Sequence, residues 1–222
     1  MELFIKRQGK HSLLVKIYVD EIIFGSTNTQ LVKEVSKLMH GEFEKSLMGE
    51  LSYFQGLQIK QLKEGTFVCQ TKYCQELLKR FEMEDAMSID MPMLTNGNLE
   101  RDENGKDVYV KRYRGMIGPL LYLTTSRRDI KFSVCMCARY QSTSKESHFK
   151  AVKRILRYLN GTFKYGLWFS NGSDCSLVGY SDSGFSDCKS DMKNTSGTCH
   201  IFSKSLVSWN SKKKSFIALS TE

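Results

Sequence analysis

The chain has 222 residues, 41% of them hydrophobic and 26% charged, which is typical of a globular protein that buries a core as one large or two small domains. Lys and Arg number 33 against 24 Asp and Glu, and this net charge of +9 suits a polyanionic partner, although plain solubility explains it equally well. The N-terminus lacks a continuous apolar stretch, so we expect no signal peptide, no membrane span and no membrane partner.

The cysteine pattern indicates neither a metal site nor a disulfide framework. The seven cysteines show no Cys-x-x-Cys and no paired zinc spacing. They lie at positions 69, 74, 135, 137, 175, 188 and 199. We therefore expect reduced, mostly buried thiols and an intracellular location, either cytoplasmic or nuclear.

The N-terminal segment is predicted to form a hairpin with two acidic residues at its tip. Residues 13–19 alternate with the period of two typical of a strand, and residues 22–24 return as a second strand after Asp20 and Glu21. This alternation places Tyr18 and Asp20 on one face. A carboxylate at the tip of a rigid hairpin is well placed to hold a hard cation such as Mg²⁺. An ordinary surface hairpin explains the same spacing, because turns favour Asp.

Two elements are expected to flank this hairpin. The apolar run at residues 3–5 is predicted to pair with it as a third strand. Residues 29–39 carry apolar side chains at three- and four-residue spacing, with Gly41 just beyond. This pattern predicts an amphipathic helix that ends near Gly41 and packs behind the hairpin.

Residues 51–83 are predicted to contain two strands and a helix. Strands at 51–59 and 66–70 flank a Lys-Glu-Gly turn signal. Thr71 is predicted to cap the helix that follows at 72–83, which presents aromatic and leucine side chains along one face.

A linker and a helical block follow. Residues 84–110 contain Met-Pro-Met and two Asn-Gly pairs that break any period, so we expect a long irregular crossing. Residues 111–160 are predicted to be helical. Ser144 is expected to cap the last helix of this block and Gly161 to end it.

This last helix carries a basic stripe opposite its apolar side. The apolar side consists of Phe149, Val152, Ile155, Leu156 and Leu159. The basic stripe, with no acid inside it, consists of Lys150, Lys153, Arg154 and Arg157. Such a stripe suits tracking of a phosphate backbone, because neutralised phosphates release condensed counterions. A solvated basic face is the alternative.

The C-terminal part changes period again. Between residues 175 and 210 three short alternating segments predict three successive strands of an antiparallel sheet. Val178, Tyr180 and Asp182 are predicted to share one face. Taken alone, Asp182 is a routine acid at the end of a strand.

Several of these segments resemble one protein family. Tyr18-Val19-Asp20-Glu21 resembles the Tyr-x-Asp-Asp hairpin of reverse transcriptases, and its flanks resemble the copia-type retrotransposon version. Further matching segments follow in the family's order at residues 51–59, 70–73, 113–118, 156–162 and 179–182. The resemblance spans roughly residues 10 to 222. This many motifs in the same order argue against chance agreement.

The resemblance to copia-type Pol polyproteins implies an α+β fold in which a partial reverse-transcriptase palm and thumb precede a truncated ribonuclease H-like β-sheet. It implies part of the palm and the start of the thumb at 1–83 and a linker at 84–110. A helical thumb- or connection-like block is implied at 111–165, and a truncated ribonuclease H-like domain at 166–222.

The same resemblance implies site residues and partners. Asp20 and Glu21 of the hairpin, and Asp182 of the ribonuclease-like strand, are the implied catalytic and Mg²⁺-binding residues. The implied partners are an RNA or DNA template-primer, or an RNA–DNA hybrid, and the oligomeric state stays open.

Both implied sites depart from the family's pattern. Glu21 stands where the family has Asp, and an extra methylene can misplace a ligand of Mg²⁺, which demands near-octahedral geometry. Glu2 is the only acid before Asp20, so the family's upstream aspartate is not matched. In the ribonuclease-like motif Gly184 replaces an acid, and Glu222 aligns ambiguously with the start of a further acidic motif.

Two more departures affect the helical block. Pro119 lies where a helix is expected, and an interior proline costs about 3 kcal/mol. Arg128 stands where the family has the proline of Ser-Arg-Pro-Asp. These changes are typical of a partial or decayed gene copy.

These observations favour a fragment of a retrotransposon RNA-directed DNA polymerase and ribonuclease H that is catalytically incompetent alone. One alternative is a basic nucleic-acid-binding module without catalysis. The other is a non-functional product of a decayed element.

Overall fold

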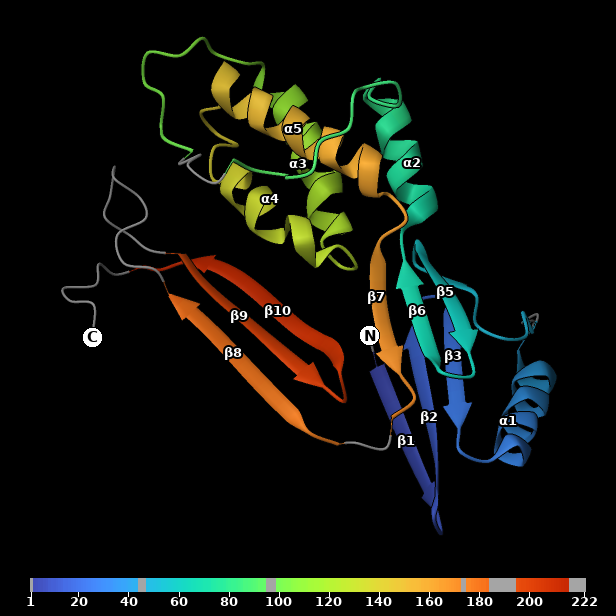
Figure 1. Ribbon diagram of the computed structural model, residues 1–222. Helices are drawn as coiled ribbons and strands as arrows, with labels where there is room; N and C mark the ends of the chain where they lie inside the picture. The colour runs from blue at the N-terminus through green and yellow to red at the C-terminus, as the bar shows by residue number, and fades with distance from the viewer. Residues whose placement is uncertain (1, 44–46, 95–98, 173–174, 184–194, 216–222) are drawn as a thin grey trace. The chain divides into compact units, whose positions relative to one another are not determined.

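The computed structural model describes residues 2–43, 47–94, 99–172, 175–183 and 195–215 (Figure 1). The chain forms two compact units, Met1–Leu51 and Ser52–Glu222. The described residues contain five α-helices and three antiparallel sheets, a mixed α and β architecture. Within this part of the chain, no helix is both long and apolar enough to cross a membrane.

The first unit is a three-stranded meander followed by one helix. Its strands are β1 (Glu2–Gln8), β2 (His11–Tyr18) and β3 (Glu21–Ser26), paired in the order β1-β2-β3. This confirms the predicted hairpin and its third strand.

Helix α1 (Thr29–Glu42) contacts β3, as predicted, and its buried residue is Leu31. The side chain of Asn28 caps the helix by accepting a hydrogen bond of 2.9 Å from the backbone N–H of Gln30. The helix continues through Gly41, where the sequence predicted its end, and its C-cap is Phe43. Gly41 has no positive φ, so it does not form the left-handed cap that ends many helices.

The second unit contains a four-stranded sheet in the order β4-β5-β6-β7. The strands are β4 (Tyr53–Phe54), β5 (Leu57–Leu62), β6 (Gly65–Cys69) and β7 (Gly166–Ser170). The strand β7 lies far along the chain from β6, and no sequence pattern predicted this pairing. A side chain at Gly166 would collide with the carbonyl of Val68 at 2.4 Å, so this close pairing requires glycine.

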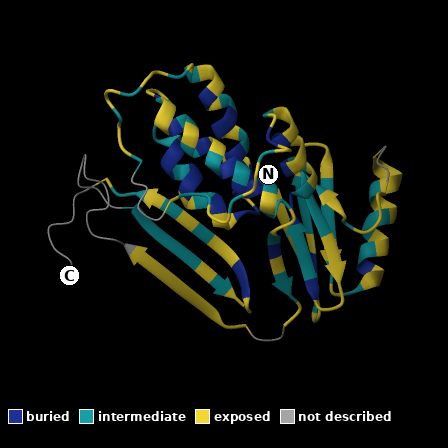
Figure 2. Ribbon diagram, turned by 45° about the horizontal axis from the view of Figure 1, so that its top comes forward, coloured by how far each residue is buried: buried dark blue, intermediate teal, exposed yellow. Residues whose placement is uncertain are grey.

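Four helices build the core of the second unit. They are α2 (Thr71–Arg80), α3 (Val110–Leu123), α4 (Lys131–Ala138) and α5 (Glu146–Thr162), with a short 3₁₀ turn (Arg128–Ile130) before α4. Buried residues gather on these helices, as Figure 2 shows in dark blue. The predicted apolar side of α5 is confirmed, because Val152, Ile155, Leu156 and Leu159 are each 0% exposed. Phe149 is half-buried against the same core.

The predicted helix boundaries need three corrections. Gln70, and not Thr71, is the N-cap of α2, and the Thr71 hydroxyl donates instead to the sulfur of Cys69. Ser144 does not cap α5; it is buried, and its hydroxyl donates to the carbonyl of Val108 at 3.3 Å. The α5 helix passes Gly161 by one residue.

Pro119 lies inside α3, as expected from the sequence. Residues 81–109 contain no helix or strand among those described. This crossing is fastened to α5, because the Asn160 amide donates to the carbonyls of Glu84 at 2.9 Å and Ala86 at 2.8 Å.

The third sheet consists of β8 (Leu177–Ser183), β9 (Thr195–Phe202) and β10 (Ser205–Lys213) in the order β10-β9-β8. All pairs are antiparallel, which confirms the three predicted strands. Helix α4 contacts β10, and the Arg139 guanidinium donates to the Thr195 hydroxyl at 2.7 Å. The described positions of β8 are exposed, including Leu177 and Tyr180 (Figure 2).

Candidate functional site

The two acids of the predicted hairpin site lie in different parts of the hairpin, Asp20 in the turn and Glu21 in a strand. The register pairs Tyr18 with Glu21, so the turn between β2 and β3 consists of Val19 and Asp20 alone. The acidic pair was expected at the tip, but Glu21 is the first residue of β3 and faces Tyr18 across the strands. Both acids are exposed.

Val19 has an unusual backbone conformation. Its φ is +49°, in the left-handed region, and its side chain is 81% exposed. A β-branched residue rarely adopts positive φ, whereas a two-residue hairpin turn requires it. The turn therefore holds Val19 under backbone strain beside Asp20, and such strain is commonly found at functional sites.

The hairpin supplies few metal ligands. Among the described residues, no group of three or more His, Cys, Asp or Glu side chains is arranged to hold a metal ion. Two-metal chemistry needs several carboxylates that converge on ions roughly 3.5–4 Å apart. Asp20 and Glu21 alone do not fit such a pair of ions.

Asp182 lies inside β8 and pairs with Gly197, where the sequence placed it at the strand end. The regular register of β8 keeps Val178, Tyr180 and Asp182 on one face, as predicted. Asp182 is exposed. The rest of its motif, from residue 184 on, lies outside the described residues. Glu222 also lies outside them.

The basic stripe of α5 divides into an exposed half and a half-buried half. The exposed half consists of Lys150 and Lys153. The Lys150 ammonium lies 3.4 Å from the Glu146 carboxylate, an exposed ion pair of little energetic value. The Lys153 ammonium lies 5.0 Å from the centre of the Phe149 ring. The Arg112 guanidinium of α3 lies 5.0 Å from the same ring.

Arg154 and Arg157 form the other half, which is half-buried. The Nε of Arg157 donates to the carbonyl of Met87 at 2.8 Å, so this side chain holds the irregular crossing against α5. The Nε of Arg154 is buried and has no hydrogen-bond partner in the protein. These two residues therefore contribute to packing as well as to surface charge.

The sequence analysis did not identify an ionic cluster around Arg127, whose side chain is 2% exposed, whereas that of its partner Asp129 is 29% exposed. Its Nη2 lies 2.6 Å from Oδ2 of Asp129, and its Nε donates to Oδ1 at 3.0 Å. Its Nη1 donates to the carbonyl of Thr162 at 2.8 Å, at the end of α5. The Tyr158 hydroxyl completes the cluster by donating to Asp129 at 2.8 Å.

This environment shifts the pKa of Arg127, Asp129 and Tyr158. Burial lowers the pKa of Arg127, but the hydrogen bond and charge of Asp129 outweigh it and hold that pKa above its usual value. Burial raises the pKa of Asp129, but the hydrogen bonds and charge of Arg127 outweigh it and hold that pKa below its usual value. Burial, followed by the carboxylate of Asp129, raises the pKa of Tyr158 to about 12. One signal could have revealed the cluster: Ser126, Arg127 and Asp129 match the family's Ser-Arg-Pro-Asp motif around Arg128.

Burial of the described cysteines is less complete than the sequence predicted, because Cys135 and Cys199 are half-buried and Cys175 is exposed. Six of them are free, and Cys69, Cys74 and Cys137 are buried. The seventh, Cys188, lies outside the described residues.

Comparison with known proteins places these features in context. Residues 1–95 match the family described as reverse transcriptase (RNA-dependent DNA polymerase). Across 99% of its length the chain is 31% identical to a retrovirus-related Pol polyprotein from transposon RE2 of Arabidopsis thaliana. Across 98% it is 28% identical to the one from transposon TNT 1-94 of Nicotiana tabacum. The chain spans only 15% and 17% of these two polyproteins.

A shorter relative has a similar extent. An uncharacterized mitochondrial protein of Arabidopsis thaliana is 31% identical over 92% of this chain, and the match covers 85% of that protein. No solved structure matches the chain significantly.

Proposed function

Because the chain belongs to the copia-type retrotransposon Pol family and carries a reverse transcriptase domain, we propose that it binds nucleic acid through α3 and α5 without catalysing polymerisation alone. The family implies a nucleic-acid template, and reverse transcriptases generally use divalent metal ions. The similarity to a short mitochondrial protein fits a fragment of such an element.

One observation carries the binding part of this proposal. Arg112 and Lys153 come from different helices, yet their charged groups lie 5.0 Å from the same Phe149 ring. Neither forms an ion pair among the described residues. Two cations gathered on one aromatic ring without a carboxylate favour an anionic partner, and phosphates fit this requirement. Lys150 extends the same helix surface.

The hairpin supports the lack of independent catalysis. Asp20 lies in the turn and Glu21 on the adjoining strand, and Glu21 reaches one methylene further than the family's Asp. Mg²⁺ tolerates little deviation from octahedral geometry. The two side chains therefore provide a weak site for a single hard cation.

The remaining assignments follow from family order. The three antiparallel strands β8, β9 and β10 support a ribonuclease H-like sheet within 166–222, with Asp182 as its metal-binding acid. We assign 1–83 to part of the palm and the start of the thumb, 84–110 to a linker and 111–165 to a thumb-like helical block. The free thiols support an intracellular location.

A salt titration tests the binding part. The affinity for a fluorescein-labelled RNA–DNA hybrid is measured by anisotropy at several salt concentrations. Replacing Arg112, Lys150 and Lys153 by Ala should flatten the slope of log K against log salt by roughly 0.7–0.9 per lost contact.

The matched control removes the same charge elsewhere. Lys37, Lys60 and Lys79 are exposed, and their replacement by Ala should leave the slope close to that of the parent. Equal slopes for both triple variants would show that the surface of α3 and α5 is a solvated basic face that does not bind nucleic acid.

A further inference from the structure

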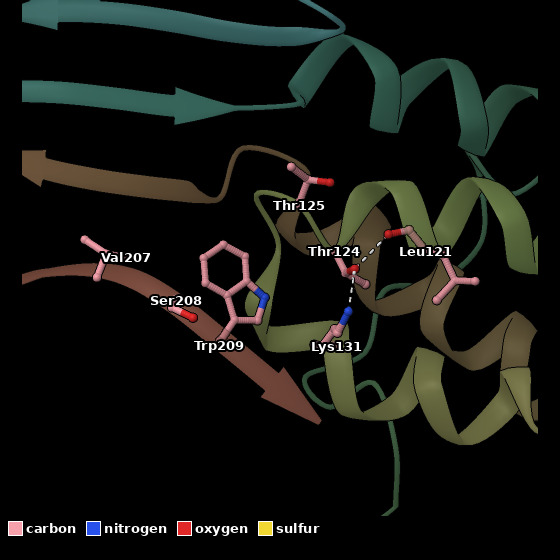
Figure 3. A pocket seen from close by; sticks show the side chains of 7 residues that line it. All are labelled: Leu121, Thr124, Thr125, Lys131, Val207, Ser208 and Trp209. Carbon is pink, nitrogen blue, oxygen red and sulfur yellow. Dashed lines mark hydrogen bonds between the residues drawn. The ribbon is translucent and has the colours of Figure 1, made fainter. Parts of the chain in front are cut away.

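A pocket of about 440 Å³ lies between the helical block and β10 in the second unit (Figure 3). Ligand pockets typically measure about 300–1,000 Å³, so a single nucleotide fits its size. None of the site residues predicted from the sequence lies in it. Its lining residues are Leu121, Thr124, Thr125, Lys131, Val207, Ser208 and Trp209.

A β-bulge shapes one wall of this pocket. In β10 the pairing with β9 shifts between Leu206 and Ser208, so Val207 has no opposite residue. Successive side chains of a regular strand point to opposite faces, and a bulge re-aims them. This shift allows three consecutive residues, Val207, Ser208 and Trp209, to line the same pocket.

The opposite wall contributes a positive charge. Lys131 is half-buried at the start of α4 and forms no ion pair among the described residues. Its ammonium donates to the hydroxyl of Thr124 at a long 3.5 Å. The acid nearest to it in sequence, Asp129, is already engaged by Arg127 and Tyr158. Because this charge has no acidic partner, an anionic group is a favourable occupant.

Trp209 contributes a flat aromatic surface. Its indole points into the pocket toward Thr124 and Lys131 (Figure 3). Among the described residues, Trp209 is half-buried and stacks on no other ring. An aromatic face beside a cation is the combination that holds a base and its phosphate in single-stranded nucleic acids.

We infer that this pocket binds one nucleotide of a single strand, with the base against Trp209 and a phosphate on the ammonium of Lys131. The hydroxyls of Thr125 and Ser208 provide further hydrogen bonds to the sugar or phosphate. This inference rests on the proposed function, because it adds a single-strand site to a chain that binds nucleic acid through α3 and α5.

The fluorescence of Trp209 offers a direct test. The chain has two tryptophans, so Trp168→Phe in the full chain leaves Trp209 as the sole emitter. This protein is titrated with single-stranded oligothymidylate of about eight nucleotides, a length within the usual site size. An abasic oligomer of the same length and thymidine monophosphate are titrated in parallel. We expect the oligothymidylate to quench Trp209 and the abasic oligomer to leave its emission unchanged.

Variants of the lining residues complete the test. By anisotropy of labelled oligothymidylate, Lys131→Met and Trp209→Leu should each weaken binding by roughly tenfold. Trp209→Phe should retain most of the affinity, because it keeps a stacking face. Lys72→Met, which removes an exposed cation of α2, is the charge control and should bind like the parent. Thermal unfolding of each variant verifies that it is folded.

Three results would overturn the inference. The first is unchanged affinity in the folded Lys131→Met and Trp209→Leu variants together with weaker binding by the Arg112, Lys150 and Lys153 variant. This result would show that the pocket does not bind the strand, and the proposed function would still hold. Quenching by thymidine monophosphate at the same concentrations as the oligomer would assign the pocket to a free nucleotide instead of a strand. Absence of any binding by the parent chain would overturn the inference and the proposed function together.

Discussion

The guanidinium of Arg127 and the carboxylate of Asp129 lie 2.6 Å apart, and the Arg127 side chain is 2% exposed. Arg127 also donates to the carbonyl and the hydroxyl of Thr162 at 2.8 and 2.7 Å. The pair thereby ties the segment after α3 to the end of α5. A buried charge whose partner is removed is strongly destabilising, because it remains uncompensated in a poorly solvating interior.

We therefore expect Asp129→Asn to lower the free energy of unfolding by about 3–5 kcal/mol, since Arg127 is left buried without its counter-charge. Urea unfolding measures this change. Arg128→Ala removes an exposed arginine at the next position and should stay within about 0.5 kcal/mol of the parent. Similar losses in the two variants would contradict the role of the Arg127–Asp129 pair.

Alkaline pH should destabilise the helical core through its thiols. Burial raises the pKa of Cys74 to about 11 and that of Cys137 to about 12. An unfolded thiol titrates near pH 8.5. As the pH rises, the unfolded chain loses these protons before the folded chain does. The stability that the two protonated thiols contribute is therefore fully present below about pH 8.5 and is lost as the pH rises toward the folded pKa values.

The free energy of unfolding should therefore fall between pH 8.5 and 10.5, by at most about 1.4 kcal/mol per pH unit for each thiol. Urea titrations at several pH values measure it. Cys74→Ala should flatten the dependence, whereas Cys175→Ala, at an exposed position, should keep the parent's curve. A Cys74→Ala curve as steep as that of the parent would be inconsistent with this explanation.

The two halves of the α5 stripe should separate stability from binding. Arg157→Ala removes the hydrogen bond to the Met87 carbonyl and should lower the free energy of unfolding by about 1–2 kcal/mol. Lys153→Ala removes an exposed cation and should leave stability within about 0.5 kcal/mol while weakening binding to nucleic acid. The reverse pattern in paired urea and salt titrations would contradict this division.

Gly56 should tolerate no side chain. Its φ is +78°, and an added Cβ would lie 2.5 Å from the hydroxyl oxygen of Tyr122, which donates to the carbonyl of Gln55. We expect Gly56→Ala to lower the free energy of unfolding by about 1–3 kcal/mol. Gly118→Ala, in open space on α3, should instead raise it by up to about 1 kcal/mol. Calorimetry measures the melting temperature of each variant. Melting temperatures equal to that of the parent in both variants would contradict this explanation.

The sequence predicted those elements whose signal is local. The period of two in residues 13–19 indicated β2, and the Lys-Glu-Gly signal placed the turn between β5 and β6. The prediction of the apolar side of α5 was confirmed, because residues spaced three and four apart face the same core. The partner of a short strand has no such signal, so the pairing of β7 with β6 was missed.

The candidate site was predictable only in part. Asp20 was identified from its motif, but the register that separates it from Glu21 depends on which residues close the turn. Ser144 and Thr71 have the chemistry of caps, and tertiary contacts with Val108 and Cys69 take their hydroxyls instead. Arg127 was overlooked because an arginine is expected at the surface unless its partners are known.

The primer-extension assay needs two matched variants. Glu21→Asp restores the acidic pair of the family, and Asp20→Asn removes the carboxylate of the turn. If ligands are lacking beyond this pair, restoring Asp at position 21 cannot create a two-metal site. Circular dichroism of all three proteins would verify that the hairpin unit remains folded.

Extension of an annealed RNA template and DNA primer by the purified chain, with Mg²⁺ or Mn²⁺ present, tests the central claim most directly. We predict that the chain and its Glu21→Asp variant bind the template-primer but add no nucleotide. Extension by the unmodified chain that disappears in Asp20→Asn would show that this hairpin completes a working polymerase site, and would contradict the proposal.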